Sequence, residues 1–416
     1  MPFKGLTKEP RLGYVLGAAA FLALPLEVVS WPSVTPVMVA AALGVLVLRE
    51  QGRFAVPCWL PIVCALVAAY GCVSAAWSLE PARSFRLGLW LLGTFAAGLV
   101  LLDGARRLGP EAREIWARGL IIGFFVGLAL LEFMLLTKGR VLDAVRNIQA
   151  VKAVIGVQRP VDFPAAFDTA MTLTVFLAWA VIAVLLRQRR PVAALVAAAL
   201  ALAVVAQGGS TTSVIAYVVG ILVFAAACLA PRATGWAVGV VLVVWLAAAP
   251  TLLSQPVLER WTEAAAPYLG NKESSLAHRL AIWHFVVGKI DERPLLGWGL
   301  DSSRWMPGGH TAYGVGSELL PLHPHDGALQ IRLDLGLPGV ILGMAFVIAL
   351  MRSLLAWETA APNKAVALAL LSGAAILAAA SYDLWHIWWL TMLWLGAVFA
   401  TAALRSEAEP RPSDRR

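Results

Sequence analysis

Long apolar runs with almost no charge recur from one end of this chain to the other. A run of about 20 such residues can cross the ~30 Å hydrocarbon core of a bilayer as a helix. Hydrophobic residues make up 60% of the 416 and charged residues 14%, whereas about a quarter of a soluble chain is charged. Inside a bilayer the backbone must satisfy its own hydrogen bonds, as an α-helix does. The sequence therefore predicts an all-α polytopic membrane protein.

We predict about twelve transmembrane helices, joined mostly by short polar connections. The predicted spans are 12–29, 34–48, 55–76, 85–102, 115–136, 165–186, 192–206, 212–230, 234–253, 338–357, 365–380 and 384–404. An even number of spans places both termini on one side. The connections on that side hold most of the cations, including Arg49, Arg106 and Arg187, so the positive-inside rule makes that side cytoplasmic.

Four regions follow from this layout. Residues 1–253 carry nine spans and a basic external loop at 137–164, and residues 254–337 form one long periplasmic loop with the candidate active site. Residues 338–404 carry the last three spans. The charged, proline-containing tail at 405–416 is predicted to be disordered.

All six histidines fall outside the middle of the apolar runs and, in this topology, on one side of the membrane. They are His278, His284, His310, His323, His325 and His386. A transporter would carry intramembrane charges along a path, and Glu132 is the main such charge here. The pattern favours an enzyme that works at the external face over a lipid-linked glycan transporter.

The external loop at 137–164 breaks the charge rule. It holds Lys138, Arg140, Arg146, Lys152 and Arg159 against only Asp143 and Asp162. One interpretation is a docking site for phosphate or pyrophosphate, which arginine binds in a bidentate manner. The other is an amphipathic helix whose basic face meets anionic lipid headgroups. Arg159 is the favoured functional candidate, because it lies just before a span at the level of lipid phosphates.

The long external loop contains a predicted helix that begins at Ser274 or Ser275 and ends near Gly288. Leu276, Leu280, Trp283 and Val287 form its apolar stripe. Arg279 lies at the edge of this stripe, so its guanidinium could point into a cleft at the membrane surface. Alternatively, it snorkels and covers apolar surface.

The segment from His323 to Gly339 predicts a second helix. Pro324 favours an extended His323, and Asp326 can cap a helix that ends near Leu335 with Gly336 as its stop. His325 then stands at a helix N-terminus, where the dipole attracts anions and favours neutral imidazole. Asp326 would oppose this by favouring the charged imidazolium.

Three roles are open for His325: a general base or substrate-positioning residue, a metal ligand, or a structural capping residue. No further histidine or carboxylate follows at helical spacing to complete a metal site. We therefore favour the first role and predict no metal and no cofactor. In the last external turn, Asp383 is a candidate partner of an external arginine or histidine, or simply an exposed acid.

Together these residues resemble the O-antigen ligase and polymerase superfamily. His325-Asp326, nine residues, then Gly336 and Gly339 is similar to the histidine signature of bacterial O-antigen ligases. The stretch from Ser275 to Trp283 that contains Arg279, followed by Pro294-Leu-Leu-Gly-Trp-Gly299, resembles their periplasmic loop. Trp77–Ser84 and Gln207–Ser213 are weaker likenesses. The chain departs from the family at Asp326, usually an amide or serine, and at Thr211, often an arginine.

The resemblance implies an inverting, metal-independent glycosyltransferase of the bacterial inner membrane. Its donor would be a polysaccharide on undecaprenyl pyrophosphate and its acceptor a sugar hydroxyl of lipid A–core. Arg279 and Arg159, with Arg146 and Lys152 as further candidates, would hold the pyrophosphate. His325 would deprotonate or orient the acceptor hydroxyl, and His323, Asp326 and Asp383 would line the substrate site.

Two other enzymes fit the same pattern: an O-antigen polymerase, whose acceptor is a second lipid-linked glycan, and a protein O-oligosaccharyltransferase. The spacing of histidine and glycines favours the ligase. The expected partners are the two lipid-linked substrates and membrane lipids, with no nucleic acid.

Overall fold

The computed structural model describes residues 8–31, 33–49, 52–148, 163, 165–254, 256–261, 263, 275–313 and 318–404. Its helices are α1 (Lys8–Val29), α2 (Val34–Leu48), α3 (Trp59–Val73), α4 (Pro81–Arg107), α5 (Pro110–Leu136), α6 (Arg140–Arg146), α8 (Asp168–Arg187), α9 (Pro191–Gln207), α10 (Thr211–Leu229), α11 (Pro231–Leu252), α13 (Ser275–Glu292), α14 (Gly327–Ala356), α15 (Ala361–Ala380) and α16 (Ile387–Leu404), with the 3-10 turns η1 (Ser74–Ala76), η2 (Ala165–Phe167) and η3 (Ser302–Trp305).

The long helices match the predicted spans. Within the described residues, 10 helices are long and apolar enough to cross a membrane, and α2 and α9 are shorter apolar helices. The all-α polytopic fold is thus confirmed, and the protein is a multi-pass membrane protein. Several helices begin earlier than predicted, because Pro81, Pro110, Pro191 and Pro231 occupy their first turns. Proline is well suited to this position, where its missing N–H leaves no helical hydrogen bond unmade.

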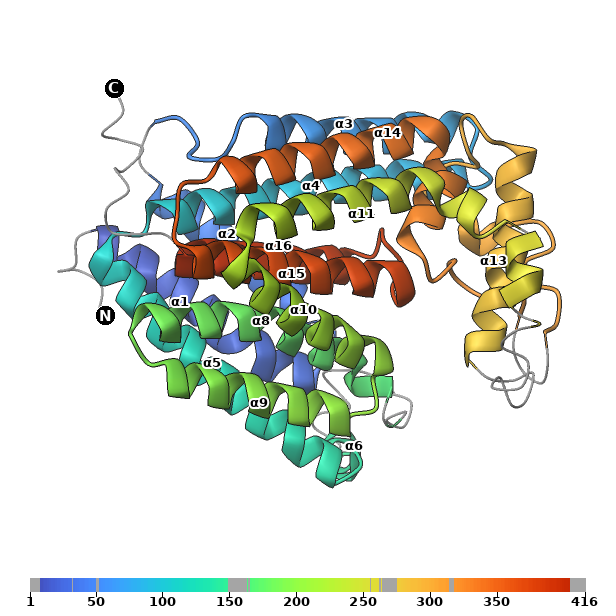
Figure 1. Cartoon of the computed structure of the whole chain (residues 1–416). Helices are drawn as coiled ribbons and strands as arrows, with labels where there is room; N and C mark the ends of the chain where they lie inside the picture. Colours follow the sequence, from blue (N-terminus) through green and yellow to red (C-terminus); the bar gives the residue numbers. More distant parts are fainter. Residues whose placement is uncertain are drawn as a thin grey trace.

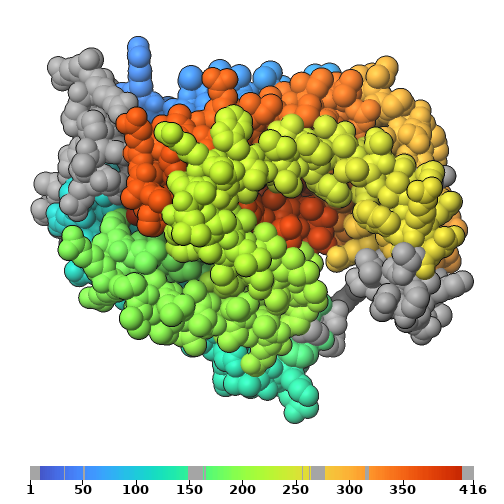
Figure 2. All heavy atoms as spheres, viewed as in Figure 1, coloured from blue at the N-terminus to red at the C-terminus, as the bar shows by residue number. Residues whose placement is uncertain are grey.

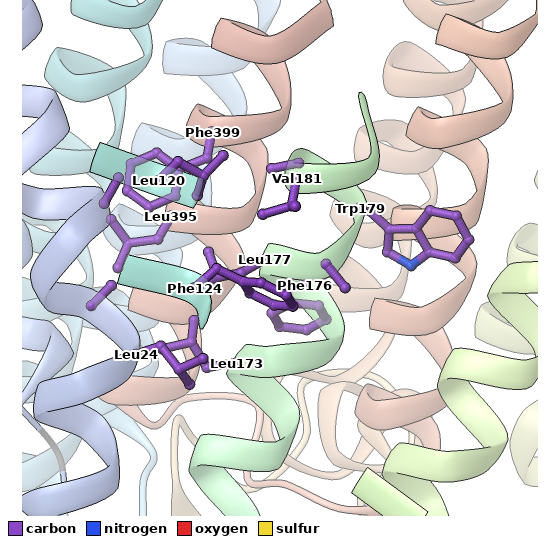
Figure 3. Packing of buried hydrophobic residues seen from close by; sticks show 14 of the residues in the cluster. Leu24, Leu120, Phe124, Leu173, Phe176, Leu177, Trp179, Val181, Leu395 and Phe399 are labelled. Carbon is purple, nitrogen blue, oxygen red and sulfur yellow. The ribbon is translucent and has the colours of Figure 1, made fainter. Parts of the chain in front are cut away.

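α8 passes through the middle of the bundle. Every residue from 170 to 185 is buried, as expected for a helix that is apolar on all sides. Phe176 of α8 lies in one hydrophobic cluster with Leu24 of α1, Phe124 of α5 and Phe399 of α16 (Figure 3). This cluster forms the core around which the other spans are arranged.

α1 and α5 approach each other closely through glycines. A Cβ at Gly123 of α5 would lie 2.4 Å from the Cα of Phe21, and one at Gly119 would lie 2.4 Å from the carbonyl oxygen of Gly17. Both distances are too short for any side chain. Between membrane helices, where lipid is as apolar as the helix surface, close backbone packing of this kind supplies much of the attraction.

A break in α14 gives the external loop its anchor. Gly336 has φ 61° and ψ −151°, and Pro338 has no N–H for the carbonyl of Asp334. The turn before η3 supplies the missing partners: Trp298 N donates to Leu333 O and Gly299 N donates to Asp334 O, each at 2.8 Å. In return, Leu337 N donates to Leu295 O at 2.8 Å. The predicted helix end at Gly336 and the predicted tight turn at 294–299 therefore form a single interlocked structure.

α13 lies across one end of the bundle, whereas α1 begins and α16 ends at the other end (Figure 1). α13 packs on α14 through a second hydrophobic cluster that includes Leu280, Val286 and Val287 of α13 and Leu329 and Leu333 of α14. We call this end of the molecule the α13 end.

The glycine contact predicts a selective loss of stability. Gly123→Ala should lower the thermal unfolding midpoint of the detergent-purified protein, because the new methyl group must separate α1 from α5, at about 1–3 kcal/mol. Gly93→Ala in α4 is the matched control, since a Cβ there meets nothing within 4 Å. Equal midpoints for the two variants would contradict the close approach of α1 and α5.

Candidate active site

His325 is held in a backbone conformation that few residues adopt. Its φ is 55°, a left-handed value that is strained for a residue with a side chain. Asp326 follows as the N-cap of α14, and its Oδ1 accepts a hydrogen bond from Leu329 N at 2.8 Å. The preceding residue is fixed as well, because Trp283 of α13 donates from Nε1 to the carbonyl of Pro324 at 3.0 Å.

One ring nitrogen of His325 is engaged. Its Nδ1 lies 3.0 Å from the carbonyl oxygen of Ser381, at the end of α15. A carbonyl only accepts hydrogen bonds, so Nδ1 carries the proton and Nε2 of the neutral ring carries the lone pair. Burial lowers the pKa of His325, and the charges of Arg279 and His278 lower it further. The ring is therefore a neutral imidazole near pH 7.

Arg279 is the arginine whose charge acts on this ring. It lies on α13, whose Leu280 and Val287 are buried, and it is itself only partly exposed. Burial lowers the pKa of Arg279, although an arginine remains charged. The sequence placed it at the edge of the apolar stripe of this helix, and its charge lowers the pKa of His325.

His323 contacts both the backbone and the ring of His325. The backbone N of His325 donates to Nδ1 of His323 at 3.2 Å, and the two ring centroids are 4.1 Å apart. Burial lowers the pKa of His323 far below its ordinary value, and the neighbouring ring of His325 adds to this effect. His323 is thus a neutral ring that supports the strained turn.

Asp383 joins three segments at the α13 end. Its carboxylate accepts from Arg304 Nη2 of η3 at 3.1 Å and from Gln330 Nε2 of α14 at 2.7 Å. Gln330 also accepts from Leu384 N at 2.9 Å. Burial opposes the charged form of Asp383, but the hydrogen bonds from Gln330 and from the N–H of Trp385 favour it, and its pKa is lowered. Asp383 is thus buried and paired, and the expectation of a partner arginine is met by Arg304.

Arg304 extends this network to a second acid. Its Nε lies 3.6 Å from Asp301 Oδ1, and Arg83 of α4 pairs with the same carboxylate at 2.6 Å. Nη2 of Arg304 also donates to Nε2 of His386 at 2.9 Å. Burial and the charge of Asp383 raise the pKa of Asp301 to about 6. Two guanidinium groups face two carboxyl groups here, so this network holds little spare positive charge.

Asp326 differs from the sequence-based expectation. We expected it to favour a charged His325. The structure buries it, and burial raises the pKa of its carboxyl to about 7. Its Oδ1 faces the start of α14 rather than the imidazole. The effect of a charged Asp326 on His325 is therefore weak, and the neutral imidazole prevails.

Of the three candidate cations of the basic loop, the structure describes Arg146. Arg146 ends α6, and its Nη2 lies 3.5 Å from the carbonyl of Val29 at the end of α1. In Figure 1, α6 lies at the lower edge of the bundle and α13 at its right-hand end. Lys152 and Arg159 lie outside the described residues. The structure thus brings together Arg279, His323, His325 and Asp383, and it places Arg146 elsewhere.

Sequence reasoning missed Arg304, Asp301, Arg83 and Gln330. A signal existed, because Asp301-Ser-Ser-Arg304 is a polar run directly after the Gly-Trp-Gly turn, and Arg83 sits in the short external segment before a span. Nothing in the sequence indicated that these residues pair with each other over 218 positions.

The network predicts that replacing Arg304 destabilises the protein strongly. Arg304→Ala should destabilise the protein by about 3–5 kcal/mol, because it leaves the carboxylate of Asp383 buried without its cation. The control is Arg118→Ala, whose partner Glu114 is 48% exposed and whose own side chain is 73% exposed, so its loss costs at most about 0.5 kcal/mol. Thermal unfolding in detergent measures both, and an Arg304→Ala midpoint equal to that of Arg118→Ala would refute the network.

Comparison with known proteins places this site within a recognised segment. Residues 196–344 match the family described as O-Antigen ligase. A segment of 128 residues is 40% identical to a Rickettsia conorii protein named "Putative polysaccharide ligase", over 30% of this chain and 31% of that protein. A Rickettsia prowazekii protein of the same name is 36% identical over 133 residues, 31% of this chain and 32% of that protein.

These alignments span about a third of the length of the curated relatives. The family match covers Arg279, Arg304, His323 and His325 and ends before Asp383. The strained histidine and its neighbouring arginine thus lie in the recognised part of the chain. By these matches, residues 196–344 are similar to the family described as O-Antigen ligase.

Proposed function

We propose that this protein is an O-antigen ligase that transfers polysaccharide from undecaprenyl pyrophosphate to a sugar hydroxyl of lipid A–core. The observation that carries the proposal is the hydrogen bond from Nδ1 of His325 to the carbonyl of Ser381, which leaves the lone pair of the neutral ring on Nε2. Arg279 on α13 supplies a cation whose charge acts on that ring. A hydroxyl acceptor needs the base, and a pyrophosphate leaving group needs the cation. The family match over residues 196–344 supports the same class of reaction.

In the proposed reaction, Nε2 of His325 accepts the proton of the acceptor hydroxyl as its oxygen attacks the anomeric carbon. The bond from that carbon to the pyrophosphate breaks, and its electron pair leaves with undecaprenyl pyrophosphate. Arg279 stabilises the charge that develops on the leaving oxygen. One displacement from the opposite face inverts the anomeric centre. Arg279 stabilises the negative charge of the leaving group, so the proposal requires no metal.

The remaining candidates take supporting roles in this proposal. His323 and Asp326 fix the strained turn that presents His325, and Asp383 holds the end of α15 whose carbonyl orients the ring. Arg146, Lys152 and Arg159 bind anionic groups of the donor in this proposal.

The proposed location is the bacterial inner membrane, with both termini in the cytoplasm and the α13 end in the periplasm. The distribution of cations between the two ends supports this orientation through the positive-inside rule. Residues 254–337 then form the periplasmic loop with the active site, and residues 405–416 form a cytoplasmic tail.

A reconstituted transfer assay tests the reaction. Purified protein is mixed with polymeric undecaprenyl-pyrophosphate glycan and lipid A–core in the presence of EDTA, and products are separated on a gel. We expect a ladder of glycosylated lipid A–core that falls at least about 100-fold in His325→Ala and Arg279→Ala, the scale of a lost base or charge-stabilising group.

The matched controls are His284→Ala, an exposed histidine on the same helix as Arg279, and Arg86→Ala, an exposed arginine of α4. Both should retain transfer. Near-normal transfer by His325→Ala would remove the base assignment. Growth of the lipid-linked glycan without transfer to lipid A–core would identify a polymerase instead.

The pH dependence of transfer gives a second test. The pKa of His325 is lowered by burial and by the charge of Arg279, so the base stays neutral below pH 6.5. The turnover number should remain level down to that pH and fall only as the pH drops through the lowered pKa. In Arg279→Met one lowering charge is gone, so the pKa rises and the acid limb should move to higher pH. The Arg86→Met limb should coincide with wild type, and an unmoved limb in Arg279→Met would show that Arg279 does not act on His325.

A further inference from the structure

A cleft of about 520 Å³ opens at the α13 end, on the side of His386. Trp90 of α4, Trp388 of α16 and His386 line it, together with Ser30 and Ser33 between α1 and α2 and Thr35 in the first turn of α2. The hydroxyls of Ser33 and Thr35 also contact Glu27 and Thr391. This volume is within the usual range of small-ligand sites. The described lining residues include none of the residues that we assign to acid–base or pyrophosphate chemistry.

None of the described residues that line the cleft carries a full charge. Arg304 contacts His386, and the charge of Arg304 is balanced by Asp301 and Asp383. Arg146 contacts the carbonyl of Val29, the residue before Ser30, and does not line the cleft. A pyrophosphate, which binds where cations are unpaired, therefore fits Arg279 better than it fits this cleft.

His386 lines the cleft and carries one hydrogen-bond donor on its ring. Its Nε2 faces the guanidinium of Arg304 at 2.9 Å, and arginine has no acceptor, so Nε2 carries the lone pair and Nδ1 the proton. Hydroxyl groups and one N–H donor beside indole rings suit a neutral pyranose. Its C–H groups pack on aromatic faces, and its hydroxyls exchange hydrogen bonds with the polar groups.

The cleft is connected to His325. His386 and Arg304 both contact Asp383, at 3.8 Å and 3.1 Å. Asp383 lies two residues after Ser381, whose carbonyl orients His325. A ligand held against His386 is thus linked, through one short turn, to the proposed base.

We propose that this cleft binds a neutral saccharide unit of one of the two lipid-linked substrates, next to its reacting bond. The inference rests on the proposed glycosyl transfer and adds a sugar-binding subsite with Trp90 as its stacking residue. The saccharide could belong to the donor glycan or to the acceptor core, and the chemistry of recognition is the same for both.

Trp90→Ala is a clean test, because the Trp90 side chain is 62% exposed and its removal leaves the core unchanged. The matched control is Trp236→Ala on α11, which is 63% exposed and lies outside the cleft. Loss of one aromatic contact should raise the KM of one substrate about three- to tenfold and leave kcat within about twofold. Thr35→Val, which removes a hydroxyl without changing shape, should raise the same KM.

Separate titrations identify the source of the sugar. A rise in KM for undecaprenyl-pyrophosphate glycan at saturating lipid A–core assigns the cleft to the donor, and a rise for lipid A–core assigns it to the acceptor. Unchanged KM values for both substrates in Trp90→Ala would overturn the subsite.

A binding measurement separates this inference from the proposed function. Delipidated core oligosaccharide and delipidated donor glycan are titrated onto the full-length protein in detergent, with saturation-transfer NMR as the readout. Binding that is weakened in Trp90→Ala and unchanged in Trp236→Ala supports the subsite even if the wild type transfers nothing. Equal binding by the two variants overturns it even if transfer is normal.

Discussion

The site depends on the buried carboxylate of Asp383. It accepts hydrogen bonds from Arg304 in the external loop and from Gln330 in α14, and it lies in the turn between α15 and α16. These contacts hold the turn so that the carbonyl of Ser381 meets Nδ1 of His325. A buried carboxylate without such partners would be costly. The ion pairs that satisfy Asp383 therefore also fix the position of the proposed base.

The membrane determines where such a network can exist. α8 is buried from residue 170 to 185, and the ion pairs of Asp301, Arg304 and Asp383 lie at the α13 end, beyond such spans. At the α13 end, the break at Gly336 frees carbonyl groups that bind the turn before η3, which brings Asp301 and Arg304 against the spans. Figure 2 shows a hollow beneath the yellow-green segment that follows α10, with the red C-terminal helices at its floor. A site at the α13 end would meet the two lipid-anchored substrates of the proposed reaction.

Local features of the site could be predicted from the sequence, and its long-range pairings could not. The cap at Asp326, the break at Gly336 and the apolar spans follow from rules that act over a few residues. Arg304 finds Asp383 across 79 positions, and one sequence gives no sign of such a pairing. The predicted effect of Asp326 on the charge of His325 was wrong. Burial raises the pKa of the Asp326 carboxyl, and this burial depends on packing that the sequence does not display.

The central claim is that His325 is a neutral imidazole with its proton on Nδ1 and a free Nε2. The most direct test is ¹⁵N NMR of the ring nitrogens in histidine-labelled protein at pH 7, with His325→Gln used to assign the signal. The account predicts a protonated, pyrrole-type Nδ1 and an unprotonated, pyridine-type Nε2 for His325. Two protonated nitrogens, or a proton on Nε2 alone, would contradict it.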